Sequence, residues 1–363
     1  MTEITKFGIT RRTALAGAAA GTALLAMPSI LRAADRSLKV GVYGGYFQES
    51  FDEHIFPDFT SATGIEVESI SEPTGEAWLV QLSQAARAGQ APADVSMMSQ
   101  VAMLKGQAID LWSPLDPAKI PNLGNLLPQF VNKYPDGRIA GVGAVAWYIT
   151  LVTNTDVFPE APTSWSALWD PVNRDRLGLL ALVSNSFLLE VTAKTFFGGP
   201  AKLDTEEGIL EAMDKLAEVK PNVRLWYRDE AQFEQALKSG EIPMGQYYHD
   251  VTRLAAADGN PVRSTFPKEG GILDSGCWAV SAASKKTAEA HEFINYMSQP
   301  QIQAKLSRNV GTAPTVARSL TDLTDEEFAA VSSDIEPIIP RYDLYQTKSD
   351  WLNQKWTELI VAG

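Results

Sequence analysis

Two runs of alternating strand and helix patterns, separated by one long extended stretch, constrain the fold of this chain more than any other feature. In the first run, strands are predicted at residues 38–43, 65–70 and 94–98, and helices at 47–61 and 75–87, with a third helix after residue 98. The Thr63-Gly64 pair ends the first helix. This β-α-β-α-β order predicts a mostly parallel sheet with helices on both faces.

The extended stretch Ile139–Asn154 follows, and the alternation then restarts. Strands are predicted at 177–183 and 242–246, and helices at 186–197, 204–219, 229–239 and 248–257. The Gly- and Pro-rich segment at 267–271 marks a second crossing, and later helices at 286–298 and 351–360 are expected to pack on the outside. Two α/β units joined by extended segments predict two lobes with a cleft between them.

The N-terminal 34 residues differ from the rest of the chain. The pair Arg11-Arg12 precedes an apolar stretch from Ala14 to about Met27, and the small residues Ala33 and Ala34 follow. This pattern predicts a signal peptide of residues 1–34, exported by the twin-arginine route. A Sec signal and an uncleaved membrane anchor remain alternatives, because Thr13-Ala14 replaces the bulkier residues that usually follow the arginine pair.

Charge and cysteine content exclude several classes of function. The chain has a net charge of −13, and loss of residues 1–34 makes it more acidic still. Such a protein is repelled by nucleic acid and by anionic membranes. Cys277 is the only cysteine, so an internal disulfide is excluded, and no second long apolar run follows the N-terminus. We therefore expect a soluble mature chain whose core is large enough to be stable without disulfides.

The segment Asp274-Ser275-Gly276 resembles the surroundings of a serine nucleophile. A serine nucleophile needs a base, and the only histidines are His54, His249 and His291, none of which has a sequence signature that ties it to Ser275. The strand-turn-helix setting of a G-x-S-x-G motif is also missing. A secreted serine hydrolase is the weakest of the alternatives, and we predict that the protein is not an enzyme.

Cofactor motifs are not convincing either. Gly141-Val142-Gly143 with Ala146 imitates a dinucleotide fingerprint, but it lies inside an extended apolar run and not between a strand and a helix. The sequence has no phosphate-binding G-x-x-x-x-G-K-[ST] loop, and it has too few His and Cys residues for a typical zinc site. We therefore predict no cofactor and no metal.

Aromatic residues beside short polar segments occur at predicted strand ends and crossings. These segments are Tyr43-Gly44-Gly45-Tyr46, Trp147-Tyr148, Tyr247-Tyr248-His249-Asp250, and Asp274 with Trp278. Strand ends of a parallel sheet open onto its ligand crevice, so the segments can converge on one cleft. Each ring taken alone is equally consistent with core packing. Together they resemble an aromatic box with one or two carboxylates, which suits an organic cation.

Several segments give the chain a resemblance to the periplasmic solute-binding proteins of ABC importers, of the polyamine-binding type. The most specific are TSWSALW at 163–169 and FPKEGG at 266–271, and the others are YGGY at 43–46, ATGI at 62–65 and GTAPT at 311–315. The resemblance covers nearly the whole mature chain. These segments identify the family strongly, but they say little about which ligand is bound.

The resemblance implies a fold, partners and a location. The fold is α/β, a two-lobed type II periplasmic binding protein in which helices flank a mostly parallel sheet in each lobe. Lobe 1 would comprise residues 35–148 with 272–312, and lobe 2 residues 149–271 with 313–363. The lobes would close on a polyamine or related amine by a hinge motion. An ABC permease with its ATPase would receive the solute in the periplasm of a Gram-negative cell, and we expect a monomer.

We hypothesise that the pocket is built from tyrosines, one tryptophan, carboxylates and small residues. The residues are Tyr43, Gly44, Gly45, Tyr46, Ser99, Tyr148, Tyr247, Tyr248, Asp250, Asp274 and Trp278. The resemblance implies that Tyr248 or Tyr247 takes the place of a ligand-stacking tryptophan and that Asp274 lies near the position of an acid. The carboxylates expected after the first lobe-2 strand are absent from Val183–Ser186, which favours a smaller or singly charged amine.

The adjacent pair Tyr247-Tyr248 leaves a rival interpretation open. Ferric-ion-binding proteins of a neighbouring family carry paired tyrosines near this place, and two phenolates suit a hard, highly charged cation. The His and Glu ligands that this family carries upstream have no clear match in the chain. The TSW and FPKEGG segments favour the organic ligand instead.

Overall fold

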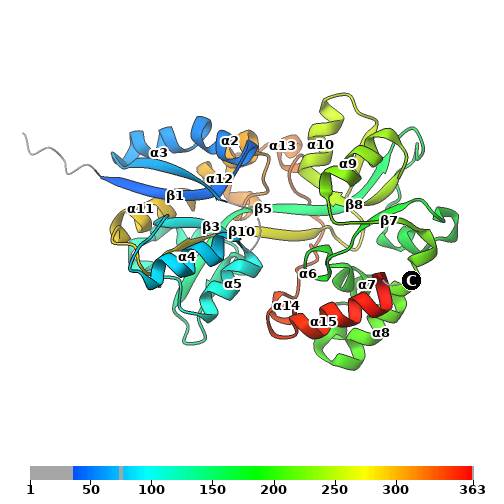
Figure 1. The fold of residues 1–363 in the computed structure, drawn as a ribbon. Helices are drawn as coiled ribbons and strands as arrows, with labels where there is room; N and C mark the ends of the chain where they lie inside the picture. Colours follow the sequence, from blue (N-terminus) through cyan, green and yellow to red (C-terminus); the bar gives the residue numbers. More distant parts are fainter. Residues whose placement is uncertain (1–35, 73–76, 362–363) are drawn as a thin grey trace, which may run out of the picture. The chain divides into compact units, whose positions relative to one another are not determined.

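The computed structural model describes residues 36–72 and 77–361, with the side chain of Tyr46 excepted (Figure 1). The predicted signal peptide lies outside the described residues. No helix in the described ranges is long and apolar enough to cross a membrane.

Ten strands in the described part of the chain form one sheet. Along its main path the order is β2-β1-β3-β10-β5-β8-β6-β7, and β4 and β9 each pair with β5. The bounds are β1 Ser37–Tyr43, β2 Glu66–Glu72, β3 Val95–Ser99, β4 Val131–Lys133, β5 Ile139–Asn154, β6 Leu177–Leu180, β7 Val223–Tyr227, β8 Met244–Tyr248, β9 Val262–Thr265 and β10 Ile272–Val280. The long strand β5 has the bounds predicted from the sequence.

Strand direction separates the outer parts of the sheet from its centre. β1 runs parallel to β2 and β3, and β6 runs parallel to β7 and β8, as the α/β alternation predicts. At the centre, β10 is antiparallel to both β3 and β5, and β5 is antiparallel to β8. β5 and β10 therefore join two parallel groups of strands.

Helices surround both groups of strands (Figure 1). Their bounds are α2 Tyr46–His54, α3 Phe56–Thr63, α4 Ala77–Arg87, α5 Gln100–Ala108, α6 Val183–Ser186, α7 Leu188–Phe196, α8 Glu206–Ala217, α9 Glu230–Ser239, α10 His249–Ala257, α11 Thr287–Met297, α12 Pro300–Val310, α13 Asp325–Ala329, α14 Tyr342–Thr347 and α15 Ser349–Trp356.

Two predicted helices are each divided in the structure. The helix predicted at 47–61 breaks at Ile55, because Pro57 lacks the N–H that would continue the first helix and instead begins the second. The helix predicted at 186–197 breaks at Phe187, which has a left-handed φ of 51°. The strand predicted at 177–183 ends at Leu180, and α6 follows.

The buried side chains form separate cores for the two groups of strands. Leu38, Phe51, Val95, Trp278 and Phe293 are among those packed around β1 and β3. Trp165, Leu177, Leu189, Met213 and Trp356 are among those packed around β6. β5 contributes Val142 to the first core and Leu151 to the second. This division supports two lobes, and the lobe boundaries given above stay a prediction.

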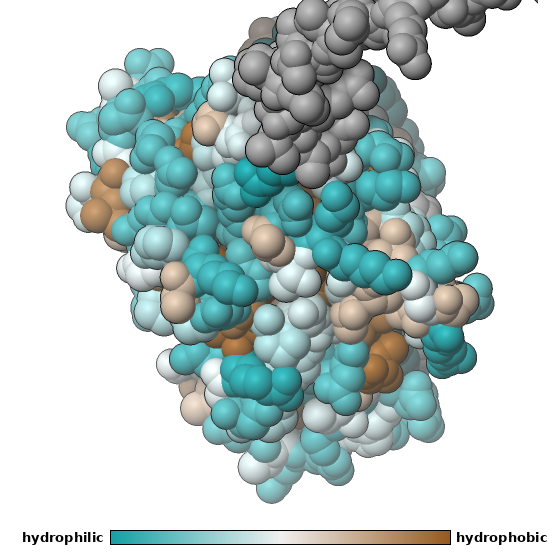
Figure 2. All heavy atoms as spheres, turned by 90° about the vertical axis from the view of Figure 1, so that its left-hand side faces the viewer, coloured by the Kyte–Doolittle hydropathy of each residue, from teal (hydrophilic) through white to brown (hydrophobic). Residues whose placement is uncertain are grey.

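The surface is that of an ordinary globular protein on the face shown in Figure 2. Hydrophilic residues cover most of this face, and the apolar residues form small separate patches (Figure 2). Scattered apolar residues are normal on such a surface. This face therefore indicates no binding site.

Candidate ligand-binding site

Asp274 lies near the start of β10, opposite Trp147 on β5. Its carboxylate atom Oδ1 accepts a hydrogen bond from the Tyr342 hydroxyl (2.6 Å) and another from the backbone N–H of Ser275 (2.8 Å). Within residues 36–72 and 77–361, no donor lies within hydrogen-bonding distance of the second oxygen, Oδ2. This carboxylate therefore has one oxygen held by the protein and one available to a ligand.

Burial raises the pKa of Asp274 to about 6, while the hydrogen bonds from Tyr342 and Ser275 lower it. Removal from water destabilises a carboxylate, and hydrogen bonds to it stabilise the charge. At neutral pH the group is still mostly ionised. It therefore presents a negative charge that water screens poorly, and such a charge favours a cationic ligand.

Four aromatic rings from four different elements surround this carboxylate. They are Tyr43 at the end of β1, Trp147 on β5, Tyr248 at the end of β8 and Tyr342 at the start of α14. The Tyr342 hydroxyl donates to Asp274, and burial raises the pKa of all three tyrosines, with nearby charges, Asp274 among them, raising it further. Tyr43 and Trp147 meet edge to face, with ring centroids 6.5 Å apart.

Two polar atoms of this cluster are buried without a hydrogen-bond partner among the described residues. They are the hydroxyl of Tyr43 and Nε1 of Trp147. Buried polar groups in native proteins nearly always have a partner, because leaving one unpaired costs about 1–3 kcal/mol. The two atoms therefore mark a place where a ligand or water completes the structure.

Glu72 adds a second carboxyl group beside Tyr43, its partner in the parallel register of β1 and β2. The side chain is 4% exposed, and Oε1 accepts from the backbone N–H of Met97 (3.2 Å). A Cβ at Gly41 would lie 2.2 Å from Oε1, so glycine is what gives this carboxyl its space. Burial raises the pKa of Glu72 to about 8 and keeps the empty site from carrying two full charges at neutral pH.

The adjacent tyrosines Tyr247 and Tyr248 lie side by side, with ring centroids 5.3 Å apart, and both hydroxyls contact Glu230. The Tyr248 hydroxyl donates to Glu230 Oε1 (2.8 Å), whereas Tyr247 is 4% exposed and its hydroxyl lies 3.3 Å from the Glu230 carbonyl oxygen. Burial first, and then the nearby acids, raise the pKa of both phenols, which opposes phenolate formation. Among the described residues no group of three or more His, Cys, Asp or Glu side chains could hold a metal ion. The raised pKa values of the two phenols therefore oppose the ferric interpretation, although the two rings lie together.

The structure places Tyr148 and Trp278 away from Asp274. Tyr148 lies on the opposite face of β5 from Trp147, because successive strand residues alternate in direction, and it packs against Phe266 with ring centroids 5.0 Å apart. The extra residue at the shift in the β5–β10 register is Ala144 on β5, so β10 keeps its alternation and Trp278 leaves the same face as Asp274, four residues further along the strand. There Trp278 is fully buried in the core beside Phe51 and Phe293.

The remaining predicted residues have other surroundings. Asp250 lies near Tyr247 and away from Asp274, with Oδ1 buried and unpartnered. Ser99 caps α5 by accepting from the Ala102 N–H (3.3 Å). Gly45 precedes α2 with a φ of 68°, and a Cβ at Gly44 would lie 2.4 Å from Ser71 Oγ, so both positions require glycine. The side chain of Tyr46 lies outside the described part of the chain.

Ser275 lies on the other face of β10 from Asp274. It is 7% exposed and borders a cavity of about 80 Å³ with Phe130, Leu273 and Tyr342. The nitrogens of His249 contact Ser264 Oγ (2.7 Å) and the Ala330 carbonyl (3.1 Å), and His291 contacts backbone atoms of Asp116 and Thr287. No described histidine contacts Ser275, so the nucleophile–base pair of a hydrolase does not form here.

Helix α14 positions Tyr342 between the two groups of strands. Tyr345 donates to Glu190 Oε2 (2.7 Å) on α7, and the Arg341 N–H donates to Glu190 Oε1 (2.8 Å). On its other side, Gln346 Nε2 donates to the Leu104 carbonyl (3.3 Å) on α5. The sequence analysis missed Tyr342, because this helix is short and has no motif.

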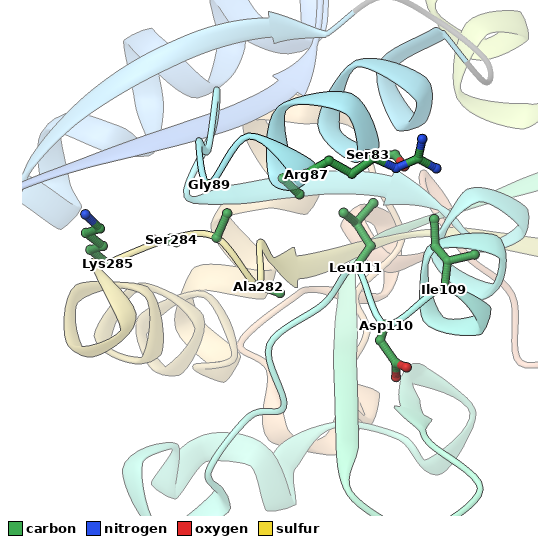
Figure 3. Close-up of a pocket in the computed structure, with 11 residues that line it drawn as sticks. Ser83, Arg87, Gly89, Ile109, Asp110, Leu111, Ala282, Ser284 and Lys285 are labelled. Atoms are coloured by element: carbon green, nitrogen blue, oxygen red, sulfur yellow. The ribbon is translucent and has the colours of Figure 1, made fainter.

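A hollow of about 650 Å³ lies elsewhere, at the far end of β10 (Figure 3). Residues 282–285, which follow β10, form one wall, and Arg87, Asp110 and Leu111 lie across from them. Arg87 and Lys285 point away from each other in Figure 3 and do not converge on a common ligand. The hollow is therefore a weaker candidate than the surroundings of Asp274, despite its size.

Comparisons with known proteins match nearly the whole described chain. The family model described as "Bacterial extracellular solute-binding protein" matches residues 54–331. The "Spermidine/putrescine-binding periplasmic protein 1" of Haemophilus influenzae is 29% identical over 281 residues, which are 74% of each chain. The "Gamma-aminobutyric acid-binding protein" of Pseudomonas aeruginosa is 27% identical over 296 residues, which are 80% of each chain.

Solved structures show the same fold. An ABC transporter substrate-binding protein from Bradyrhizobium japonicum superimposes with a TM-score of 0.75 at 21% identity, and the match covers 89% of this chain and 99% of that one. At this identity the likeness concerns the fold alone.

Proposed function

The chain belongs to the family of bacterial extracellular solute-binding proteins, and from this premise we propose that it captures a small organic amine beside Asp274. Its fold is the two-lobed α/β fold of periplasmic binding proteins that the sequence predicts. Its function as the solute-binding component of an ABC transporter is also the predicted one. The relatives favour this function over the ferric and hydrolase alternatives.

One observation carries the choice of an amine. A poorly hydrated carboxylate with one free oxygen lies among aromatic rings that come from both groups of strands. An ammonium group can pair with Oδ2 of Asp274 while its carbon chain packs against Trp147 and Tyr248. Each ring–cation contact contributes about 0.5–2 kcal/mol. Several such contacts and one ion pair are enough for micromolar affinity, which corresponds to about −8 kcal/mol.

The carboxyl groups support a short ligand over a long polyamine. Asp274 is ionised, whereas burial of Glu72 raises its pKa to about 8 and keeps it largely neutral. The segment Val183–Ser186 brings no acid to the carboxyl end of β6. Relatives named for spermidine and putrescine and a relative named for γ-aminobutyric acid all bind amines, which agrees with an ammonium group as the shared feature.

Binding by closure follows from the connections between the two lobes. β5 and β10 cross between the two groups of strands, and α14 contacts both, so a ligand at Asp274 would hold the lobes together. We place lobe 1 at residues 35–148 with 272–312 and lobe 2 at 149–271 with 313–363. The exported protein would act as a monomer in the Gram-negative periplasm, without catalysis, and deliver its amine to the permease and ATPase.

The test is a thermal-shift screen of the exported protein, followed by calorimetry. The panel contains putrescine, spermidine, betaine, amino acids and ferric citrate. A ligand that binds only the folded state raises the melting temperature, by an amount that grows with its concentration above Kd. We expect an increase with amines that Asp274→Asn abolishes. The proposal would be contradicted if ferric citrate alone raised the melting temperature, or if none of the amines raised it.

A further inference from the structure

We propose that the solute held by Asp274 is an amine that also carries an uncharged oxygen acceptor, as in an amino alcohol, and that Trp147 and Tyr43 bind this oxygen. This inference rests on the amine site proposed above and names the class of ligand more narrowly. It excludes both a simple diamine and an amino acid as the preferred solute.

The indole of Trp147 is the first part of the argument. Its Nε1–H can only donate a hydrogen bond, and no acceptor among the described residues meets it, although the atom is buried. Other indoles of this chain are satisfied: Trp78 donates to Ser96, Trp112 to the Met103 carbonyl, Trp165 to the Gly270 carbonyl and Trp356 to the Ala181 carbonyl. Among the described residues, Trp278 also has a buried indole N–H without a partner, and it is fully enclosed by apolar core residues.

The position of Trp147 distinguishes it from Trp278. Trp147 is the cross-strand partner of Asp274, so both side chains leave the same face of the β5–β10 pair. Trp147 is also only partly buried as a residue, whereas Trp278 has no exposed surface. Its unpaired donor therefore lies beside the carboxylate that would hold the ammonium group.

The hydroxyl of Tyr43 supplies a second unpaired group at the same place. It is buried without a partner, its ring meets the Trp147 ring, and its pKa is raised by burial and by the charges of Glu72 and Asp274. Two neighbouring donors without acceptors are satisfied together by one oxygen atom with two lone pairs. A hydrocarbon would satisfy neither group, and an ammonium group could donate to the Tyr43 oxygen but would leave the Trp147 N–H without an acceptor.

The charges near the site decide which kind of oxygen fits. The acids that act on Tyr43, Tyr248 and Tyr342 include Asp274 and Glu230, whereas Glu72 is largely neutral at pH 7. A ligand carboxylate would meet repulsion from these acids, because like charges at close range in a poorly hydrated site repel strongly. A hydroxyl or carbonyl oxygen accepts the same hydrogen bonds without that repulsion.

A series of four-carbon amines tests the inference by calorimetry at pH 7. The ligands are n-butylamine, 4-aminobutan-1-ol, putrescine and 4-aminobutanoic acid, which differ only at the end opposite the shared amine. We expect the amino alcohol to bind about tenfold tighter than each of the other three. Three- and five-carbon analogues of all four are measured as well, so that a poor match in chain length is recognised.

Two tryptophan variants show whether Trp147 causes the preference. Trp147→Phe keeps a ring but removes the donor, and we expect it to reduce the advantage of the amino alcohol over n-butylamine from about tenfold to less than threefold. Trp226→Phe is the control, because Trp226 is a partly buried tryptophan packed on the core around β6. It should leave the ratio of the affinities for the amino alcohol and n-butylamine unchanged. Because each result is a ratio of two affinities for one variant, a general loss of stability does not imitate it.

The outcomes separate this inference from the proposed function. If the simple amine binds but the oxygen adds nothing at any chain length, or if the diamine or the amino acid binds tightest, the inference is wrong and the amine site stands. The inference is also wrong if Trp147→Phe leaves the tenfold ratio intact. If none of the amines binds, the proposed function fails and this inference fails with it.

Discussion

The two faces of the β5–β10 pair differ in how completely their polar groups are satisfied. On one face, Asp274 keeps a free oxygen and Trp147 an unpaired donor. On the other, Tyr148 packs on Phe266 and contacts Ser332 (3.4 Å), and Ser275 is buried beside Phe130. Neighbouring residues of one strand pair therefore differ: in the proposed function a solute completes one face, whereas packing within the protein completes the other.

Removal of the charge at Asp274 should give the largest difference between the faces. Asp274→Asn should weaken amine binding at least about 30-fold, because loss of one partner of a buried charge pair costs about 2–5 kcal/mol. Ser275→Ala, one residue away on the other face, should change the affinity less than threefold. Calorimetry with the tightest amine from the screen measures both. A larger loss in the serine variant would reverse the assignment of the faces.

Tyr148 should show the opposite behaviour. Tyr148→Leu removes a buried ring from the packed face, and we expect the free energy of unfolding to fall by about 2 kcal/mol. Amine affinity, measured where the variant is fully folded, should stay within twofold of the wild type. Urea denaturation and calorimetry on the same sample test both parts. A variant that lost affinity but not stability would place Tyr148 in the site.

Acid should weaken binding through the same carboxylate. The pKa of Asp274 in the empty protein is about 6, and only the ionised form pairs with ammonium. Affinity should therefore fall about tenfold, or about 1.4 kcal/mol, for each pH unit well below 6, and above pH 7 only the ionisation of Glu72 should raise it further. Calorimetry from pH 4.5 to 8 measures the profile, and the weak residual binding of Asp274→Asn should not follow it. A flat wild-type profile would show that another group binds the amine.

The incomplete face should also reduce the stability of the empty protein. The pKa of Asp274 is raised on folding, so its favourable contribution is present below about pH 4 and is lost as pH rises through 6. Without ligand, the free energy of unfolding of Asp274→Asn should then exceed that of the wild type by about 1 kcal/mol at pH 7.5, a figure lowered because Asp274 is partly exposed. At pH 4 the two proteins should be equally stable. Denaturation curves at the two pH values provide the comparison. A variant less stable at pH 7.5 would contradict it.

The sequence predicted what depends on composition and periodicity along one segment. The bounds of β5 and the α/β alternation belong to this class, whereas the role of Asp274 stays a prediction. The sequence did not predict which side chains the alignment of neighbouring strands brings together. Tyr148 was chosen and Trp147 was left out of the predicted site, although a consistent two-residue period would have favoured Trp147 as the partner of Asp274.

Three further errors have separate physical causes. Trp278 lies on the same face of β10 as Asp274 but four residues further along, inside the core beside Phe51 and Phe293, and no local signal in the sequence shows where along the strand that core begins. Glu72 ends an alternating strand, where an acid is expected to face water, and only Gly41 on the neighbouring strand gives it a buried place. Tyr342 reaches Asp274 through the tertiary packing of α14 on Glu190, which is more than 150 residues away along the chain.

A crystal structure of the protein with its tightest amine tests the central claim most directly. The account predicts the amine nitrogen about 2.7–3.0 Å from Oδ2 of Asp274, with Trp147 and Tyr248 on either side of the ligand. An amine bound on the face of Tyr148 and Ser275, or beside Asp250 with Asp274 unoccupied, would contradict it.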